Sequence, residues 1–268
     1  MSASSDPELL RRLVEFELSL ERDSSEIVEE FDWGRLIHNP QTPAMWSGNY
    51  LEVRSTGLDA DALAALANEV QGPLEGIEHR DIMPADPDHG SRLVEGFEAL
   101  EGWEVMRSVY MVLTRAPGRQ VGPAKEVERA AVAEVRRADV EDDPDFTPEA
   151  VEQRPVRDAR LDRAGNGRWF TAPADGLPGT SCVLYGRDGI GQVESVGTSP
   201  DRRGQGLASA AVVAASEASR ERGDELIFIV ADADDWPWKL YERLGFDRVG
   251  EVCSFLRKPD QLRTEDYP

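Results

Sequence analysis

The sequence has little cysteine and histidine and no long apolar run. Its 268 residues include only two cysteines, Cys182 and Cys253, which excludes a disulfide framework. The best apolar stretch, residues 210–215, is far shorter than the ~20 residues of a membrane helix. The first residues lack a basic segment followed by an apolar one, so no secretory signal is expected. We therefore expect a globular cytoplasmic protein.

Positive charge is also scarce. The chain has 52 acidic and 30 basic residues, a formal net charge of −22, and both halves share the excess. A nucleic-acid-binding protein needs a basic stripe, which this sequence lacks, and an anionic membrane surface is disfavoured for the same reason. The acidic field either attracts cationic substrates or keeps the protein soluble.

Histidine chemistry and metal binding are not expected. All three histidines, His38, His79 and His89, lie in the N-terminal half, far from any plausible serine or cysteine nucleophile. The segment 79–89 contains aspartates and histidines, but their spacing matches no compact zinc or calcium pattern. Cys182 and Cys253 lie in apparent strands and are interpreted as small core residues. No metal site is predicted.

A stretch rich in proline and glycine, Arg115–Pro123, divides the chain. It separates an accessory α/β unit, residues 1–122, from a second α/β unit, residues 127–260. In the first unit, periodicity predicts helices over 8–30, 59–70 and 91–100, and strands over 48–54, 77–83 and 103–113. In the second, it predicts strands over 127–135, 168–172, 180–185, 192–198, 226–231 and 249–257, and helices over 147–161, 207–222 and 237–244. A helix, a glycine and a strand follow one another in both 91–113 and 239–257, which suggests two related units.

The segment from Gln192 to Ser209 carries the clearest chemical signal. A strand ends near Pro200, a turn with Gly204 and Gly206 follows, and a helix begins near Leu207. Such a turn presents unpaired backbone N–H groups at the positive end of a helix, which favours an anion. The two glycines allow a ligand to approach the backbone closely. A pyrophosphate is the expected ligand of this turn. The alternative is that the segment is an ordinary strand–turn–helix connection that binds no ligand.

Two other phosphate-binding loops fit less well. A P-loop requires Gly-Lys, which does not occur in this chain. A dinucleotide fingerprint over Gly204–Ser209 would lack its third glycine, and Pro200–Arg203 separates the strand from the glycines.

At this point the sequence resembles the GNAT acetyltransferase superfamily. Arg203-Gly-Gln-Gly-Leu-Ala208 is similar to the family's pyrophosphate loop, and Lys239-Leu-Tyr-Glu-Arg-Leu-Gly-Phe246 is similar to its Leu-Tyr-x-x-x-Gly-Phe block. The resemblance covers about residues 127–258 and implies a mixed-sheet GNAT fold with splayed central strands over 192–198 and 226–231. The unit before it is interpreted as a smaller, degenerate GNAT-like unit without a counterpart of the loop, so it is not expected to bind CoA.

The resemblance implies acetyl-CoA as the co-substrate. Its diphosphate is expected on the backbone amides of the loop, and its pantetheine arm beside the preceding strand. Asp234, where the family often has Asn, is placed in the same set. The implied cofactor-binding residues are Val196, Gly197, Thr198, Arg203, Gly204, Gln205, Gly206, Leu207, Ala208 and Asp234.

Tyr241 matches the family's usual general acid, since a phenol with a pKa near ~10 can supply a proton to a thiolate whose thiol titrates near ~8.5. The N–H of Val196 is expected to polarise the thioester carbonyl. Glu194, two residues earlier, is expected to share a strand face with Val196 and to act as the base. Asp232 and Asp234 are the competing bases.

The predicted function is therefore acetyl transfer from acetyl-CoA to a primary amine of a small molecule or peptide, by direct attack in a ternary complex. One alternative is a catalytically silent acyl-CoA-binding module that recruits a partner. Another is an acyltransferase with a different acyl donor or an O-acceptor. The chain is expected to act as a monomer with pseudo-dimeric halves or as a homodimer.

Overall fold

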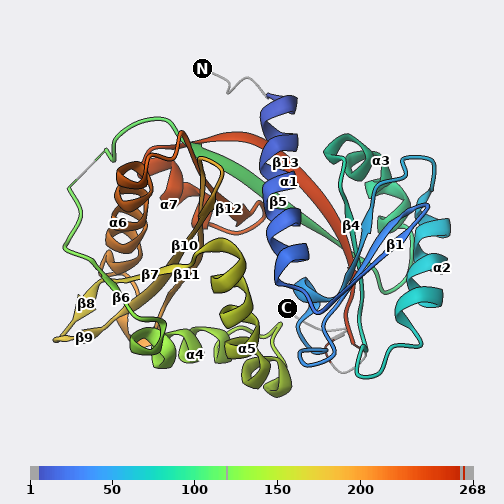
Figure 1. Ribbon diagram of the computed structural model, residues 1–268, viewed down its shortest axis with the longest axis horizontal. Helices are drawn as coiled ribbons and strands as arrows, with labels where there is room; N and C mark the ends of the chain where they lie inside the picture. Colours follow the sequence, from blue (N-terminus) through green and yellow to red (C-terminus); the bar gives the residue numbers. More distant parts are fainter. Residues whose placement is uncertain (1–5, 119, 260–261, 263–268) are drawn as a thin grey trace.

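The computed structural model describes residues 6–118, 120–259 and 262. Its main feature is a mixed sheet whose strands lie in the order β1-β2-β3-β4-β13-β5-β12-β11-β10-β7-β6, and Figure 1 shows it running through both halves of the chain. The strands are β1 Ile27–Phe31, β2 Gly34–His38, β3 Tyr50–Val53, β4 Arg80–Pro84, β5 Glu104–Leu113, β6 Lys125–Val127, β7 Arg168–Thr171, β10 Thr180–Arg187, β11 Ile190–Thr198, β12 Leu226–Asp232 and β13 Phe246–Arg257. A small separate hairpin joins β8, Pro173–Ala174, to β9, Leu177–Pro178.

The helices cover both faces of this sheet. They are α1 Pro7–Ser24, α2 Ala60–Gln71, α3 Pro87–Glu98, α4 Ala133–Glu141, α5 Pro148–Gly165, α6 Leu207–Arg222 and α7 Pro237–Arg243, with short 3-10 turns at 46–48, 129–132 and 200–202. One core cluster joins α1 and α5 to strands of both halves. On the other face, α6 and α7 pack over the C-terminal strands, and α2 and α3 over the N-terminal ones.

Each half contributes a strand to the other half's part of the sheet. β5 belongs to the N-terminal half, yet it pairs with both β12 and β13. β13 ends the C-terminal half, and its last residues, Phe255–Arg257, pair with Arg80–Ile82 of β4. The two long strands therefore join the halves through backbone hydrogen bonds.

The repeat suggested by the sequence has a structural counterpart. Among the strand pairs of the described residues, β3–β4 and β11–β12 are parallel, and each pair is connected by one helix, α2 or α6. Both α3–β5 and α7–β13 follow, each through a glycine of positive φ, Gly102 or Gly245. The loops before the helices differ, because the Asp59 side chain caps α2 by accepting from Ala62 N. In the N-terminal half, the carboxylate of Asp59 therefore occupies the place at the start of α2 where a bound anion would lie.

Two predicted elements are wrong. The expected strand over 127–135 is a short strand, a 3-10 turn and helix α4, because Val132, Val135 and Val140 are buried at helical spacing. The expected helix over 8–30 ends at Ser24, and Ile27–Phe31 forms β1, an edge strand whose residues are all exposed. The buried positions of α1 end at Ser24, before these exposed residues begin.

Candidate active site

The site lies where the two parallel strands β11 and β12 separate. They pair from Ile190–Val193 against Leu226–Ile229, and the pairing stops before Glu194 and Val230. On its other side, β11 has an irregular register with β10, and Ser195 there adopts φ 54°. Such a bulge bends the strand away from its neighbour. The splay that the resemblance implies is confirmed, and it leaves backbone of β11 free to meet a ligand.

The glycine-rich loop leads from β11 into α6. Gly204 and Gly206 both have φ 78°, a left-handed conformation that favours glycine, and a Cβ built at either position would meet nothing within 4 Å. Gly206 is the N-cap of α6 and has no side chain to satisfy the first N–H groups of that 16-residue helix. These donors and the helix dipole make the loop an open anion site.

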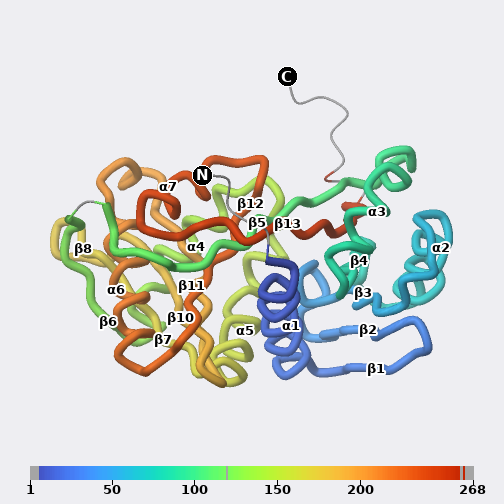
Figure 2. Tube along the Cα trace, turned by 90° about the horizontal axis from the view of Figure 1, so that it is seen from above, coloured from blue at the N-terminus to red at the C-terminus, as the bar shows by residue number. Residues whose placement is uncertain are grey.

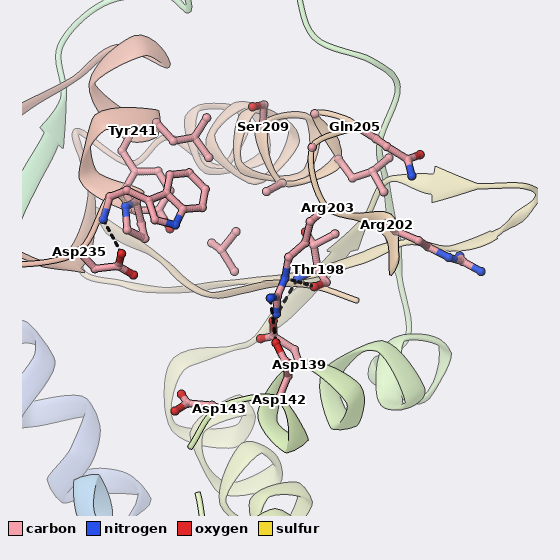
Figure 3. A pocket seen from close by; sticks show the side chains of 18 residues that line it. Asp139, Asp142, Asp143, Thr198, Arg202, Arg203, Gln205, Ser209, Asp235 and Tyr241 are labelled. Carbon is pink, nitrogen blue, oxygen red and sulfur yellow. Dashed lines mark hydrogen bonds and ion pairs between the residues drawn. The ribbon is translucent and has the colours of Figure 1, made fainter. Parts of the chain in front are cut away.

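This loop forms one wall of a cavity of about 550 Å³. The opposite walls come from α4 and from the start of α7, so that three separate segments of the C-terminal half enclose it (Figure 3). The lining residues are Asp139, Asp142, Asp143, Val196, Thr198, Arg202–Ser209, Asp235, Trp236, Pro237, Leu240 and Tyr241.

The charges in the cavity are mixed. Arg203 forms ion pairs with Asp142, at 2.8 Å, and with Asp139, at 3.7 Å. Asp139 also accepts from Thr198 N at 3.3 Å, and burial raises the pKa of this carboxyl. A Cβ on Gly197 would lie 2.2 Å from an oxygen of Asp139, so glycine is required for this close approach of α4 to β11. Arg203 can reach an incoming diphosphate only by exchanging these acidic partners.

Tyr241 lies on α7, lines the cavity at the end away from Gln205 (Figure 3) and is 6 % exposed. Its ring packs edge-on against Phe246, with the centroids 6.3 Å apart. Burial is the main cause that raises the pKa of the phenol above its ordinary value, followed by the nearby groups Cys182 and Glu194. The hydroxyl therefore keeps its proton at neutral pH, which a general acid requires.

Glu194 does not face this cavity. It lines a second cavity, of about 210 Å³, together with Glu17 of α1 and residues of β5 and β12. The expectation that Glu194 and Val196 share a strand face is wrong, because the irregular backbone at Ser195 breaks the alternation of side chains. Burial raises the pKa of Glu194. A carboxyl of raised pKa on the opposite side of the splayed strands is suited to accept a proton from a group that approaches from that side.

Most of the predicted site residues lie together. Val196, Thr198, the six loop residues Arg203–Ala208 and Tyr241 all line the larger cavity. Gly197 and Asp234 are not among its lining residues, although the next residue, Asp235, is. Asp232 lines the smaller cavity with Glu194.

The acidic residues Asp139, Asp142 and Asp143 were missed, because a strand was predicted over 127–135 and no element between 136 and 146. The spacing of Val132, Val135 and Val140 contains the signal for a helix, and in such a helix Asp139 lies on the same face as Val132 and Val135.

A buried ion network holds the bulge in β11. Arg136 of α4 donates to Ser195 Oγ at 2.9 Å and to Asp158 Oδ2 at 3.1 Å. Asp158, on α5, also accepts from Arg154 Nε at 3.0 Å. Arg136 and Asp158 are 8 % and 3 % exposed. Two helices are thereby tied to the residue at which β11 leaves its regular path.

Replacing Arg136 with Gln is expected to lower the free energy of unfolding by roughly 2–4 kcal/mol, since it leaves a buried carboxylate with one cationic partner instead of two. Urea denaturation followed by circular dichroism measures this. The double variant Arg136→Gln/Asp158→Asn, which removes both charges, is the control and is expected to recover part of the loss. If Arg136→Gln were as stable as the parent, the ion network would not stabilise the fold.

Glu17 provides a pH-dependent test. Burial raises its pKa from 4.5 to about 8. The folded chain then binds more protons than the unfolded chain between these values, so the contribution of Glu17 to stability falls as the pH rises through that window. The amide in Glu17→Gln cannot ionise and still offers an oxygen to Tyr110.

We expect Glu17→Gln and the parent to be nearly equally stable at pH 5. At pH 9 the variant is expected to be more stable by about 1–3 kcal/mol. Thermal or urea unfolding at both values measures the difference. A stability difference that does not change with pH would show that Glu17 ionises normally in the folded chain.

The described residues contain no group of three or more histidine, cysteine, aspartate or glutamate side chains placed to hold a metal ion. None of their helices is long and apolar enough to cross a membrane.

Comparison with known families shows which proteins this chain is similar to. The model of the acetyltransferase (GNAT) family matches residues 133–246, the part that contains the loop, the splayed strands and Tyr241. Residues 133–246 form a GNAT-family domain. The match begins at α4 and ends at the first residue of β13, so it includes all three segments that enclose the larger cavity.

Two curated relatives are named mycothiol acetyltransferase. The protein from Thermomonospora curvata is 28 % identical over 225 residues, which cover 77 % of this chain and 71 % of that protein. The protein from an Arthrobacter species is 39 % identical over 64 residues, which cover 24 % of this chain and only 20 % of that protein. The second match thus concerns a short segment of a longer relative.

Two solved structures share the fold over nearly the whole chain. A GCN5-related N-acetyltransferase from Kribbella flavida has a TM-score of 0.56 at 19 % identity and covers 93 % of this chain and 95 % of its own. A functionally unknown protein from Staphylococcus epidermidis has a TM-score of 0.65 at 15 % identity, with coverages of 88 % and 95 %. At these identities the likeness concerns the fold, and it includes the N-terminal half.

Proposed function

We propose that the protein transfers an acetyl group from acetyl-CoA to a primary amine in a ternary complex. The observation that carries this proposal is the position of the open glycine-rich loop and Tyr241 at two ends of one cavity of about 550 Å³. The loop supports binding of the donor's diphosphate, since both glycines leave open space and α6 directs its free N–H groups outward. Val196 and Thr198, on the splayed part of β11, line the cavity between these ends.

The acceptor is proposed to approach from the other side of the splay. Glu194, in the smaller cavity, would take a proton from the ammonium group, and Asp232 is the competing base in the same cavity. Asp234 lines neither cavity, so the geometry gives it no support as a base.

The reaction then needs no further reagent. The neutral amine nitrogen forms a bond to the thioester carbonyl carbon, with the developing oxyanion near the Val196 N–H. The carbon–sulfur bond breaks, the thiolate takes the proton of Tyr241, and the amide product and free CoA result. The bonded nitrogen gives up its extra proton to the phenolate, directly or through water, which restores the phenol.

We further propose that residues 127–260 form the catalytic unit and that residues 1–122 close the acceptor side. α1 packs into the same core cluster as α5 and strands of both halves, and Figure 2 shows it between the halves. This arrangement favours a monomer with pseudo-dimeric halves over a homodimer, and light scattering distinguishes the two.

Thermal-shift measurements with acetyl-CoA, followed by detection of free thiol with a panel of amines, test the function. The acceptor used by the mycothiol acetyltransferases belongs in that panel. Stabilisation together with amine-dependent thiol release supports acetyl transfer. Stabilisation without release by any amine would favour the silent acyl-CoA-binding module instead. Faster release with alcohols, or with a longer acyl-CoA, would favour an O-acceptor or another donor.

A further inference from the structure

The smaller cavity combines residues of both halves of the chain. It is lined by Glu17 of α1, Met106–Ser108 of β5, Glu194 of β11 and Val230–Asp232 of β12. β11 and β12 stop pairing directly before this point. The cavity therefore opens at the same splay as the larger cavity, but on the side where the N-terminal helix covers the sheet.

Two carboxyl groups of this cavity are held by neutral donors. Tyr110 Oη donates to Glu17 Oε2 at 2.5 Å, and Gln192 Nε2 donates to Glu194 Oε2 at 3.2 Å. The charge of Glu194 is one cause of the raised pKa of Glu17, after burial, so the two groups act on each other. Gln192 is 2 % exposed, and its amide oxygen has no hydrogen-bond partner among the described residues. The amide oxygen of Gln192, next to Glu194, can therefore still accept a hydrogen bond from a ligand.

No direct ion pair within the described chain neutralises the carboxyl groups of this cavity, although burial raises the pKa of Glu194 and the nearby Arg136 and Arg157 act to lower it. Neither Glu17, Glu194 nor Asp232 forms an ion pair with a described residue, although most arginines of the protein are paired. Arg107 lines the cavity, but its Nη2 donates to Glu98 at 2.7 Å. Met106 and Val230 add apolar surface. A ligand with an alkyl segment and more than one positive charge would complement this lining.

We propose that this cavity binds the acceptor and selects a small aliphatic amine that carries a second positive charge. Glu17, supplied by the N-terminal half, releases its proton to solvent when the diamine binds and pairs as a carboxylate with the second cationic group, while the reacting amine lies at Glu194. This inference rests on the proposed acetyl transfer and assigns Glu17 as a specificity-determining residue. It also gives the N-terminal half, whose own helix start is capped by Asp59, a direct part in substrate recognition.

Three probes of equal chain length test the proposal: 1,4-diaminobutane, 1-aminobutane and 4-aminobutanoate. With saturating acetyl-CoA, kcat/KM is expected to be at least ~10-fold higher for the diamine than for the monoamine, and lowest for the aminobutanoate. Glu17→Gln should lower kcat/KM for the diamine more than for the monoamine and so remove most of the advantage of the diamine. Glu8→Gln, an exposed position on the same helix, is the matched control and should keep the full advantage.

Calorimetric binding of the diamine to the parent and to Glu17→Gln separates this inference from the proposed function. Binding that depends on Glu17, without thiol release, would leave the site standing and refute acetyl transfer. Thiol release with equal preference for the two amines, or a preference that Glu17→Gln leaves unchanged, would overturn the assignment of Glu17. If Glu17→Gln does not fold, Glu17→Asp is used instead. Its side chain is one methylene shorter, so the carboxylate lies farther from the ligand and the preference for the diamine should fall.

Discussion

Tyr241→Phe is expected to lower turnover by ~10²-fold or more, the range for loss of a general acid. The thiolate would then leave without a proton donor, because the ring remains but its hydroxyl is gone. The affinity for acetyl-CoA should hardly change, since the loop at the other end of the cavity is untouched. Single-turnover rates and calorimetric dissociation constants measure the two effects separately.

Tyr185→Phe is the matched control for this prediction. Tyr185 is 1 % exposed, its hydroxyl has no hydrogen-bond partner among the described residues, and it packs in the cluster on the other face of the sheet. The same substitution there should leave turnover unchanged. If Tyr241→Phe and Tyr185→Phe both turned over at the parental rate, Tyr241 would have no part in proton transfer.

Gly206→Val is expected to raise the dissociation constant of acetyl-CoA at least ~10-fold, equivalent to about 1.4 kcal/mol. The side chain would point into the open space in front of the N–H groups of α6, where the diphosphate is proposed to lie. It would also strain a backbone at φ 78°, which costs about 1–2 kcal/mol for a residue with a Cβ.

Gly189→Val separates these two effects. Gly189 has φ 74°, also has no neighbour within 4 Å of a Cβ, and lies in the turn between β10 and β11, outside the cavity. Both variants should lose similar stability, but only Gly206→Val should bind the donor more weakly. Equal donor affinity in the two variants would show that the loop does not contact the donor.

The loop and the Tyr241 block could be found from the sequence because their function depends on local backbone. A strand, two glycines of left-handed conformation and a helix start are consecutive in the chain, so one short motif encodes the whole feature. The helix α7 is also encoded locally, because Pro237 marks its first residue and Gly245, with a positive φ, follows its end. The match to the GNAT family over 133–246 confirms what these motifs indicated.

The exchange of strands between the halves could not be predicted in this way. β5 reads as an ordinary strand of the first unit, and only the long-range pairing with β12 and β13 shows that it completes the second. Glu17 was overlooked for the same reason. It lies in an amphipathic helix, far from the loop in sequence, and only tertiary packing brings it to Glu194.

A crystal structure with bound CoA tests the central claim most directly. The account predicts the diphosphate within hydrogen-bonding distance of the backbone nitrogens of residues 204–208, with the sulfur at the Tyr241 end of the cavity. A nucleotide bound elsewhere, with these nitrogens free of it, would contradict the account.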